Sequence, residues 1–258
     1  MEIKFSNYKY NKQNINITID SNTIIGITGD SYESFLDIFD FINKFTNVSI
    51  DKVKLNSKNV MYYNNKVVYI KNVNDNMSIK EYMLYLMSNY NLEIKDINKK
   101  IIDSLKMVGL KNIDVNMIIR DLSTSEKSLL LIACSLIFNP EVIVLNNPYF
   151  GLDNKIIKRT NILFNKLVDQ YNKTIIIGSN NSNELYKYTK EMIFIKDDNI
   201  IRYDKTINVY KDIDFLNNNN FDIPLSVLFT SKANSKKKIN LNYLQDIRDI
   251  IKDIYKHV

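Results

Sequence analysis

Residues 142–153, VIVLNNPYFGLD, constrain the fold more than any other stretch of this chain. Four consecutive aliphatic residues predict a β-strand that is buried on both faces, as in the interior of a parallel sheet. Two asparagines, a proline and a Gly-Leu-Asp triplet follow this strand directly. Because open α/β sheets bind ligands beyond the carboxyl ends of their strands, Asn146 and Asn147 are expected at a functional edge.

The predicted elements alternate between strands and helices, which indicates an α/β fold. We expect strands within residues 1–29 and at 67–70, 142–145 and 174–178, and helices at 30–45, 78–118, 123–138 and 155–171. Residues 191–204 have the pattern of a hairpin with Asp-Asn at its turn. After residue 208 the chain changes character: 215–224 is predicted to be a linker and 241–258 an amphipathic helix.

The composition argues against several kinds of site. The single histidine, His257, lies next to the C-terminus, so a histidine-based active site is not expected. The single cysteine, Cys134, lies in the apolar stretch LLLIACSLIF and is expected in the core, without an internal disulfide. We expect neither a membrane span, which needs roughly 18 apolar residues, nor a signal peptide. The net charge of +6 favours an anionic partner or a membrane surface.

The spacing of the glycines and prolines points to a family. From residue 122 the sequence is LSTSEKSLLLIACSLIFNPEVIVLNNPYFGLD. It resembles, without a gap, the segment of ATP-binding cassette (ABC) ATPases that contains the signature motif, its helix, an Asn-Pro turn, the Walker B strand and the D-loop. The signature corresponds to Leu122, Ser123, Thr124, Ser125 and Glu126, of which Leu122 and Ser123 match while both signature glycines are missing; Gly151, Leu152 and Asp153 match the D-loop. All five glycines and all three prolines fall on family landmarks, and these residue types impose backbone conformations that others accept poorly.

The resemblance covers about residues 1–230 and implies an α/β fold of defined type. This is a P-loop NTPase-like core with an antiparallel β edge, an α-helical subdomain at about 72–138 and a small C-terminal extension. We therefore expect an ABC ATPase-like domain at 1–207 and the extension at 208–258. Residues 221–224, FDIP, resemble a stretch of the energy-coupling factor ATPases, which are the most similar branch of the family.

The same resemblance implies a site for ATP and Mg²⁺ and assigns further positions to it. Tyr10 corresponds to the tyrosine that stacks on adenine, Lys71 to the Q-loop glutamine and Asn180 to the switch histidine. The phosphate loop corresponds to Gly29, Asp30, Ser31, Tyr32, Glu33, Ser34 and Phe35.

The residues at the catalytic positions have changed. Asn146 and Asn147 replace the acids that position Mg²⁺ and polarise the attacking water in the family. A neutral amide has no basic oxygen that accepts a proton at pH 7, so a general-base contribution of roughly 10²–10⁴ in rate is expected to be absent. Asn180 likewise lacks the charge of the switch histidine.

The phosphate loop has changed as well. A working loop directs successive N–H groups and a lysine at the phosphates. With a loop two residues shorter, Ser34 matches the Mg²⁺-binding serine, Glu33 replaces the lysine and Tyr32 a glycine; without a gap, Phe35 stands at the lysine. Neither alignment supplies a cation, and high-affinity ATP binding is therefore not expected. Lys71 could reach an anion but lacks the acceptor of the glutamine that it replaces.

In the signature, the S-x-x-E spacing of Ser123 and Glu126 predicts a capping box at the start of a helix. This structural role is independent of any contact with nucleotide.

We therefore expect a pseudo-ATPase: a cassette subunit of a membrane transporter of the energy-coupling factor type. It would form a heterodimer with an active ABC ATPase partner and dock on an integral membrane component, cytoplasmic and peripheral at the inner face of the cell membrane. One alternative is a working ATPase that uses Asp30, Glu33 or Asp153 as displaced acids. A second is a nucleic-acid-binding module that uses the lysines of 235–238 and the basic tail, although a lone basic run is usually a solvated face. Neither a nucleic-acid partner nor a metal site is expected.

Overall fold

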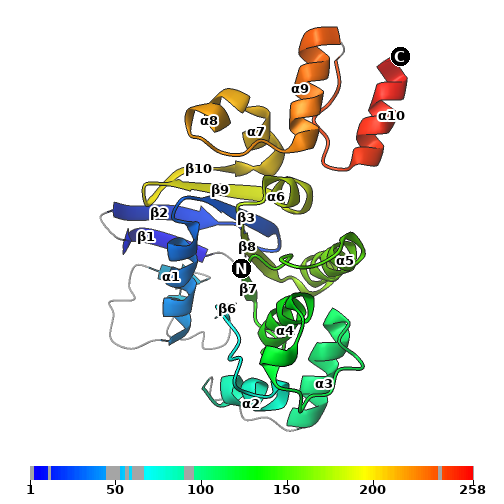
Figure 1. The fold of residues 1–258 in the computed structure, drawn as a ribbon. Coiled ribbons are helices and arrows are strands. Elements are labelled where there is room, and N and C mark those ends of the chain that lie inside the picture. Colours follow the sequence, from blue (N-terminus) through cyan, green and yellow to red (C-terminus); the bar gives the residue numbers. More distant parts are fainter. Residues whose placement is uncertain are drawn as a thin grey trace.

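The computed structural model describes residues 3–10, 13–44, 53–55, 58–59, 67–89, 96–237 and 240–257. These residues form a central sheet with helices on both faces and a group of C-terminal helices at one end (Figure 1).

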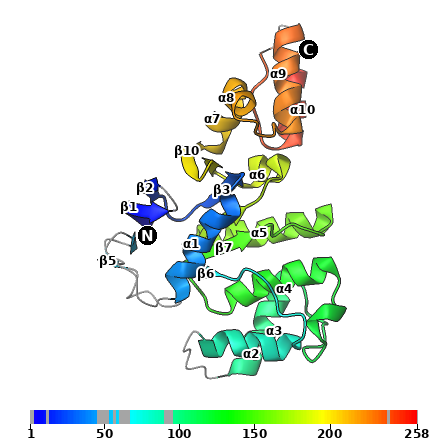
Figure 2. The same cartoon turned by 60° about the vertical axis from the view of Figure 1, so that its left-hand side comes forward.

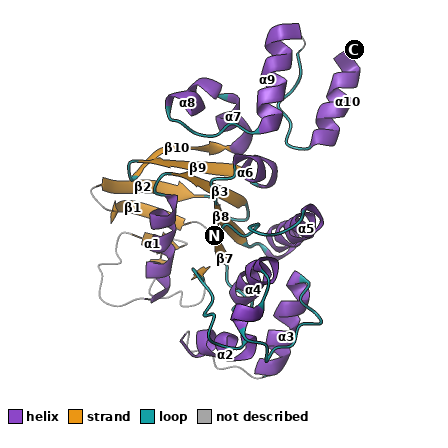
Figure 3. Cartoon of the chain, viewed as in Figure 1, coloured by secondary structure: helices purple, strands orange, loops and turns teal. Residues whose placement is uncertain are grey.

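Six strands make up the central sheet. Figure 3 shows the strands in orange and the helices in purple. The strands are β3 (Ile24–Gly29), β6 (Val67–Tyr69), β7 (Val142–Asn146), β8 (Thr174–Gly178), β9 (Glu191–Lys196) and β10 (Asn199–Lys205). Their order is β10-β9-β3-β8-β7-β6, and neighbouring strands are parallel except for the β9–β10 hairpin. The parallel strand predicted at 142–145 is confirmed as β7.

The sheet separates two hydrophobic cores. Side chains alternate along each strand, so that Ile25 and Ile27 of β3 pack in one core while Ile24 packs in the other. In β7, Val142 and Val144 lie on the first side, together with Ile25 and Ile27. Because both faces are covered, the central strands β7 and β8 consist of aliphatic residues except at their ends.

One face is covered by α1 (Tyr32–Lys44) and a second, antiparallel sheet. That sheet has the order β2-β1-β4-β5 and contains β1 (Ile3–Tyr10), β2 (Gln13–Ile19), β4 (Val53–Leu55) and β5 (Lys58–Asn59). Phe35 of α1 is fully buried, with its ring centroid 6.3 Å from that of Phe5 and 6.2 Å from that of Phe39. This aromatic cluster joins α1 to β1.

The other face is covered by helices. They are α2 (Ile79–Asn89), α3 (Ile97–Val108), α4 (Thr124–Leu136), α5 (Asn154–Tyr171) and α6 (Ser182–Tyr188), with a 3₁₀ turn at Ile119–Asp121. The helical stretch expected at 78–118 is α2 and α3, which lie at the end of the molecule beyond α4 (Figure 2). Cys134 of α4 is buried, as predicted.

The C-terminal region is more helical than expected. It contains α7 (Thr206–Lys211), α8 (Ile213–Asn218), α9 (Leu225–Lys237) and α10 (Ile247–His257). The linker predicted at 215–224 was wrong in its first part, because α8 packs Leu216 into the core. The terminal helix begins at Ile247 rather than at residue 241. The domain boundary expected at 207/208 falls inside α7, whose Val209 is also a core residue, and the division into domains stays a prediction.

The hairpin between β9 and β10 turns one residue earlier than predicted. Asp197 and Asp198 occupy the turn, with φ of 50° and 61°. Two successive positive φ values are typical of a type I′ turn, which matches the twist of the paired strands. Among the described residues, no helix has the length and apolar character needed to cross a bilayer.

Candidate functional site

Tyr32 extends across the carboxyl ends of β7 and β8. It is the first residue of α1, and its side chain is almost fully buried although it begins at a helix terminus. Its hydroxyl lies 3.1 Å from Oδ1 of Asn146 and 2.9 Å from Nδ2 of Asn147. The two asparagines that follow the buried strand are therefore joined to the start of α1.

The hydrogen bonds around this hydroxyl form one consistent set. Asn147 Nδ2 donates to the Tyr32 oxygen, and the Tyr32 proton is donated to Asn146 Oδ1. Asn146 Nδ2 then donates to Glu33 Oε1 at 3.4 Å. The alternative partner for the tyrosine proton is the same Glu33 oxygen, at 3.3 Å. These four side chains, Tyr32, Glu33, Asn146 and Asn147, are called the tyrosine network below.

Burial and close packing fix the position of Tyr32. Burial raises the pKa of its phenol to about 12, so the hydroxyl remains a donor at neutral pH. The ring lies over Gly178, the last residue of β8. A Cβ atom there would lie 2.9 Å from two ring carbons of Tyr32 and 2.5 Å from Cδ1 of Leu36, so only glycine leaves room for the tyrosine.

The connection from β3 to α1 has only two residues, Asp30 and Ser31. Both side chains accept hydrogen bonds from the β9–β10 turn. The backbone N–H of Asp197 donates to both carboxylate oxygens of Asp30, at 3.2 and 3.1 Å, and the N–H of Asp198 donates to Ser31 Oγ at 3.1 Å. The connection therefore holds the hairpin with its acceptors rather than encircling an anion with its N–H groups.

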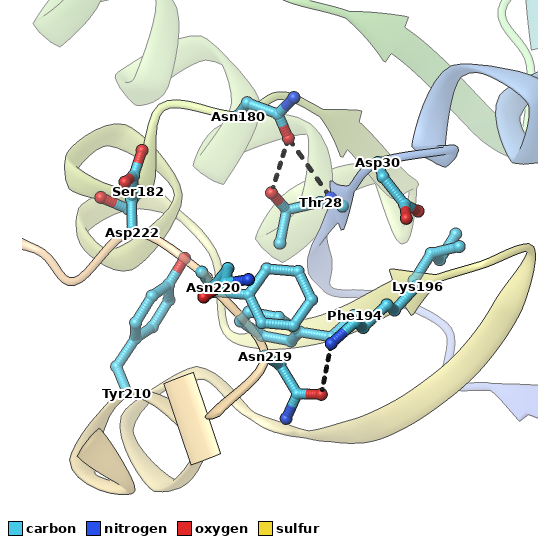
Figure 4. A pocket seen from close by; sticks show the side chains of 13 residues that line it. Thr28, Asp30, Asn180, Ser182, Phe194, Lys196, Tyr210, Asn219, Asn220 and Asp222 are labelled. Atoms are coloured by element: carbon cyan, nitrogen blue, oxygen red, sulfur yellow. Dashed lines mark hydrogen bonds between the residues drawn. The ribbon is translucent and has the colours of Figure 1, made fainter. Parts of the chain in front are cut away.

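Asn180 closes the end of β3 on the other side. Its Oδ1 accepts hydrogen bonds from Thr28 Oγ1 at 3.0 Å and from the N–H of Gly29 at 3.3 Å (Figure 4). A cavity of about 430 Å³ opens next to it, between the ends of β3 and β9 and the segment 219–222. Lys196 is the cation of this cavity and donates to Asn219 Oδ1 at 3.3 Å, while Asp30 and Asp222 add two carboxylates.

The remaining positions assigned to a nucleotide site lie apart from the tyrosine network or have other roles. Lys71 binds Asp37 of α1 at 2.9 Å, so its charge is already matched. Phe35 is a core residue, and Ser34 is exposed on the first turn of α1. Tyr10 is the last residue of β1, where it pairs with Gln13.

The signature and D-loop positions form a second cluster. Gly151 has φ of 72°, and a Cβ on it would lie 2.7 Å from Cγ2 of Thr124. Ser128 Oγ donates to the carbonyl oxygen of Phe150 at 2.7 Å. Asp153 caps α5, because its carboxylate accepts from the N–H groups of Lys155 and Ile156. The turn is thus built against the start of α4.

The capping box predicted at the start of α4 is confirmed. The N–H of Ser123 donates to Glu126 Oε2 at 2.9 Å, and the N–H of Glu126 donates to Ser123 Oγ at 3.3 Å. The Ser123 hydroxyl also donates to Glu126 Oε2, at 2.7 Å, and this bond together with that from the Ser123 N–H holds the pKa of the Glu126 carboxyl below its usual range. Leu122 is buried, whereas Ser125 is partly exposed beside the cap.

The residues at the carboxyl edge of the sheet do not fit ATP and Mg²⁺. The Tyr32 side chain crosses from α1 to β7, the space that phosphates would need. A two-residue connection presents few N–H groups to an anion, and the two acidic side chains at this edge, Asp30 and Glu33, would repel one. Within the described ranges, no three His, Cys, Asp or Glu side chains gather closely enough to hold a metal ion.

Two features of this edge were not anticipated from the sequence. Tyr32 was expected only as a replacement for a loop glycine, and the docking of the β9–β10 turn on Asp30 and Ser31 was not expected. The short connection between the first buried strand and the first helix could have indicated both features. A strand that ends at Gly29 and a helix that begins at Tyr32 leave no room for a longer phosphate-binding loop.

Comparison with known proteins gives several relatives. No protein-family model matches the chain. It is 30% identical over 138 residues to the energy-coupling factor transporter ATP-binding protein EcfA2 of Mycoplasma mobile, a match that covers 54% of this chain and 44% of that relative. It is 24% identical over 184 residues to the putative ABC transporter ATP-binding protein MG304 of Mycoplasma genitalium, covering 70% and 67%. The match therefore spans less than half of the first relative.

Solved structures agree on the architecture. The ATP-binding cassette MJ0796, in a dimeric state bound to ADP and Pi, superposes with a TM-score of 0.63 at 22% identity, over 79% of this chain and 98% of that one. CbiO1 of Clostridium perfringens, part of the ABC transporter complex cbiONQ, gives a TM-score of 0.63 at 18% identity, over 84% and 94%. The chain thus has the fold of an ABC ATPase cassette, and its homologues are ABC ATPases that include the ATP-binding proteins of energy-coupling factor transporters.

Proposed function

We propose that this chain is a catalytically inactive cassette subunit of an energy-coupling factor type transporter. The observation on which this rests is the tyrosine network. Tyr32 joins α1 to Asn146 and Asn147 at the edge where the family binds the phosphates of ATP. A buried and hydrogen-bonded side chain must be displaced before a phosphate can enter.

The chemistry of the edge supports the same proposal. Hydrolysis needs a group that polarises water, and neither asparagine amide accepts a proton at neutral pH. The nearest carboxylate, Glu33, accepts a hydrogen bond from Asn146 and has no cation beside it among the described contacts. Loss of a positioned general base removes about 10²–10⁴ in rate, before the weaker binding of nucleotide is counted.

The displaced acids of the alternative ATPase are all engaged elsewhere. Asp30 accepts from the N–H of Asp197, and Asp153 accepts two N–H groups as the cap of α5. Glu33 belongs to the tyrosine network. A carboxylate that already accepts hydrogen bonds from its own chain is held in place and is less free to turn toward water. The basic run of the nucleic-acid alternative lies partly outside the described residues, and no contact of the described ones favours that alternative.

Pairing with an active cassette is proposed from the second cluster. Gly151 packs on Thr124, and Ser128 donates a hydrogen bond to the carbonyl of Phe150. These contacts hold the turn in place although the residues at the catalytic positions differ from those of the family. In the family this segment forms the subunit interface. Phe150 itself is exposed and offers an apolar contact to a partner. We propose that the partner supplies the working site and that both subunits dock on an integral membrane component.

Hydrolysis by the purified chain tests inactivity. We expect Mg²⁺-dependent phosphate release at background level, where an ordinary enzyme would turn over roughly 1–10³ times per second. An intact cassette ATPase in the same buffer serves as the positive control. Turnover in that range by this chain alone would overturn the proposal.

Co-expression tests the pairing. The chain is produced with an intact cassette ATPase and a membrane component, and the complex is captured in detergent through a tag on the membrane component. We expect Phe150→Asp to reduce recovery of this chain strongly, and Tyr171→Asp, at another exposed aromatic residue, to leave it unchanged. Recovery of a complex in which the partner pairs only with itself would contradict the heterodimer.

A further inference from the structure

A groove lies between α3, α4 and α5, which are neighbours in both views of the molecule (Figures 1 and 2). Its volume is about 620 Å³, compared with about 430 Å³ for the cavity next to Asn180. Ile143, the second residue of β7, lines the groove, whereas the tyrosine network lies at the other end of that strand. The groove and the tyrosine network are therefore at opposite edges of the sheet.

The floor of the groove is apolar. It is formed by aliphatic side chains from the end of α4, from β7 and from α5, none of them more than 9% exposed: Leu136, Ile137, Ile143 and Leu167. The hydroxyl of Ser104, which also lines the groove, donates to the carbonyl oxygen of Ile101 within α3, at 2.8 Å. A polar group on this floor would lose its hydrogen bonds to water, so the floor favours an alkyl chain.

The rim of the groove is cationic. Lys100 of α3, Lys166 of α5 and Lys173, just after α5, line it, and Asp103 is the one carboxylate among the lining residues. Lys173 donates to Oδ1 and to the carbonyl oxygen of Asn139, at 2.8 and 3.2 Å, and both acceptors are neutral. No ion pair between described residues involves Lys100 or Lys166. The rim therefore has a surplus of positive charge.

We infer that this groove binds the anion of a long-chain fatty acid, with the alkyl chain on the floor and the carboxylate at the lysines of the rim. Small-molecule sites typically have volumes of about 300–1,000 Å³, apolar walls and a few polar groups that fix one end of the ligand. A carboxylate accepts charge-assisted hydrogen bonds from lysine. A peptide fits less well, because its backbone N–H and C=O groups would need partners that an aliphatic floor does not offer.

The groove is also separate from the turn that is proposed to contact a partner cassette. That turn leads into α5 at Asn154, and Lys166 lies about 18 Å further along the helix. A fatty acid can therefore bind to the free chain and to the paired one, and the inference does not rest on the proposed function.

Titration calorimetry of the wild-type chain with saturated fatty acids, below the concentrations at which they form micelles, tests the inference. We expect dodecanoate to bind at one site per chain, and dodecyltrimethylammonium, with the same alkyl chain and the opposite charge, not to bind there. From hexanoate to dodecanoate the affinity should rise by up to about fourfold for each methylene group that the floor buries. Absence of dodecanoate binding, an equal affinity for the cation, or an affinity that does not depend on chain length would each overturn the inference.

Charge reversal tests the position of the carboxylate. Lys166→Glu should raise the dissociation constant of dodecanoate about tenfold, because a charge-assisted contact is lost and a repulsion is added. Lys158→Glu makes the same change at another exposed lysine of α5, outside the groove, and should leave the dissociation constant unchanged. Equal binding by the two variants would show that the rim does not hold the carboxylate.

The absence of tryptophan from the sequence allows a local probe. Met107 lines the groove and is 49% exposed, so Met107→Trp introduces the only indole of the chain without removing a buried side chain. We expect its fluorescence to shift to the blue when dodecanoate is added. Ile162→Trp, at a side chain of α5 that is 71% exposed and outside the groove, is the matched control and should not respond. An equal response of both variants, or none at residue 107 while calorimetry shows binding, would place the fatty acid elsewhere and overturn the inference.

Discussion

The hydroxyl oxygen of Tyr32 lies 3.1 Å from Oδ1 of Asn146, so the first turn of α1 is bonded directly to the end of β7. A strand end and a helix start that would face each other across a ligand are here in contact. The same hydroxyl accepts a hydrogen bond from Asn147, so the phenol both donates and accepts at the end of β7.

Removal of this hydroxyl should destabilise the protein. Tyr32→Phe keeps the ring over Gly178 but leaves the two amides without their shared partner, which costs about 1–3 kcal/mol in the free energy of unfolding. Urea unfolding followed by circular dichroism measures the change. Tyr171→Phe, at an exposed tyrosine, is the control and should stay within about 0.5 kcal/mol of the wild type. Equal stability of both variants would show that the tyrosine network is not formed in solution.

Restoring acids at the end of β7 should not restore hydrolysis. In the double variant Asn146→Asp with Asn147→Glu, Tyr32 and the two-residue connection remain, and effects within one catalytic unit are not additive. Phosphate release should therefore stay at background. Robust turnover would show that the edge accepts ATP despite Tyr32.

The stability of the single variant Asn146→Asp, relative to the wild type, should depend on pH. Its new carboxylate replaces an amide that donates to Glu33 Oε1 at 3.4 Å, and each of the two acids then raises the pKa of the other in the folded state. A raised folded pKa means that the penalty is present at neutral pH and relieved as the pH falls and one acid is protonated. The stability difference from the wild type should thus narrow between pH 7 and about pH 5. A difference that is constant over this range would place the two side chains apart.

The capping box predicts a pH dependence in the wild-type protein itself. Hydrogen bonds from Ser123 hold the pKa of Glu126 below its usual range, so its stabilising contribution is present above the unfolded pKa of about 4.3 and is lost as the pH falls through the lower, folded value. Glu126→Gln should therefore be less stable than the wild type at pH 7, by an amount that shrinks in acid. Glu141→Gln is a comparison outside the cap. A difference that grows in acid would contradict the assignment.

Cys134 offers a measure of global opening. It is fully buried in α4, and burial raises the pKa of its thiol, so little reactive thiolate forms. A thiol reagent should react with the native protein only as fast as the protein unfolds, and completely in denaturant. Rapid reaction in buffer would show that α4 opens locally.

The fold could be predicted from local patterns because those patterns are strong. The aliphatic run of β7 predicts a buried strand, and the S-x-x-E spacing at Ser123 predicts a capping box. The structure contains both. The exact position of the β9–β10 turn could not be predicted in this way. From the sequence, either of two adjacent residue pairs could form the turn, and only the pairing of β9 with β10 shows that the pair begins at Asp197. In α8, the asparagines suggested a linker, and burial of Leu216 overrode their poor helix propensity.

The site was harder to predict, because it depends on contacts between distant segments. Tyr32 and Asn146 are 114 positions apart, and no periodicity encodes their meeting. The same holds for Asp30 and the turn at Asp197, which are 167 positions apart. The sequence indicated which chemical groups had been replaced; only the structure shows what fills the space.

Tyr32 is tethered to the edge that it covers, so its local concentration there does not change with dilution. A phosphate that competes for this edge meets an occupant already in place, and its apparent affinity is the intrinsic affinity multiplied by the fraction of time for which the tyrosine is displaced. A protein that is stabilised by a bound ligand gains stability as the ligand becomes more abundant. The folding of this chain is instead expected to be the same in energy-rich and energy-depleted cells, since the group that completes its sheet edge is encoded in the chain.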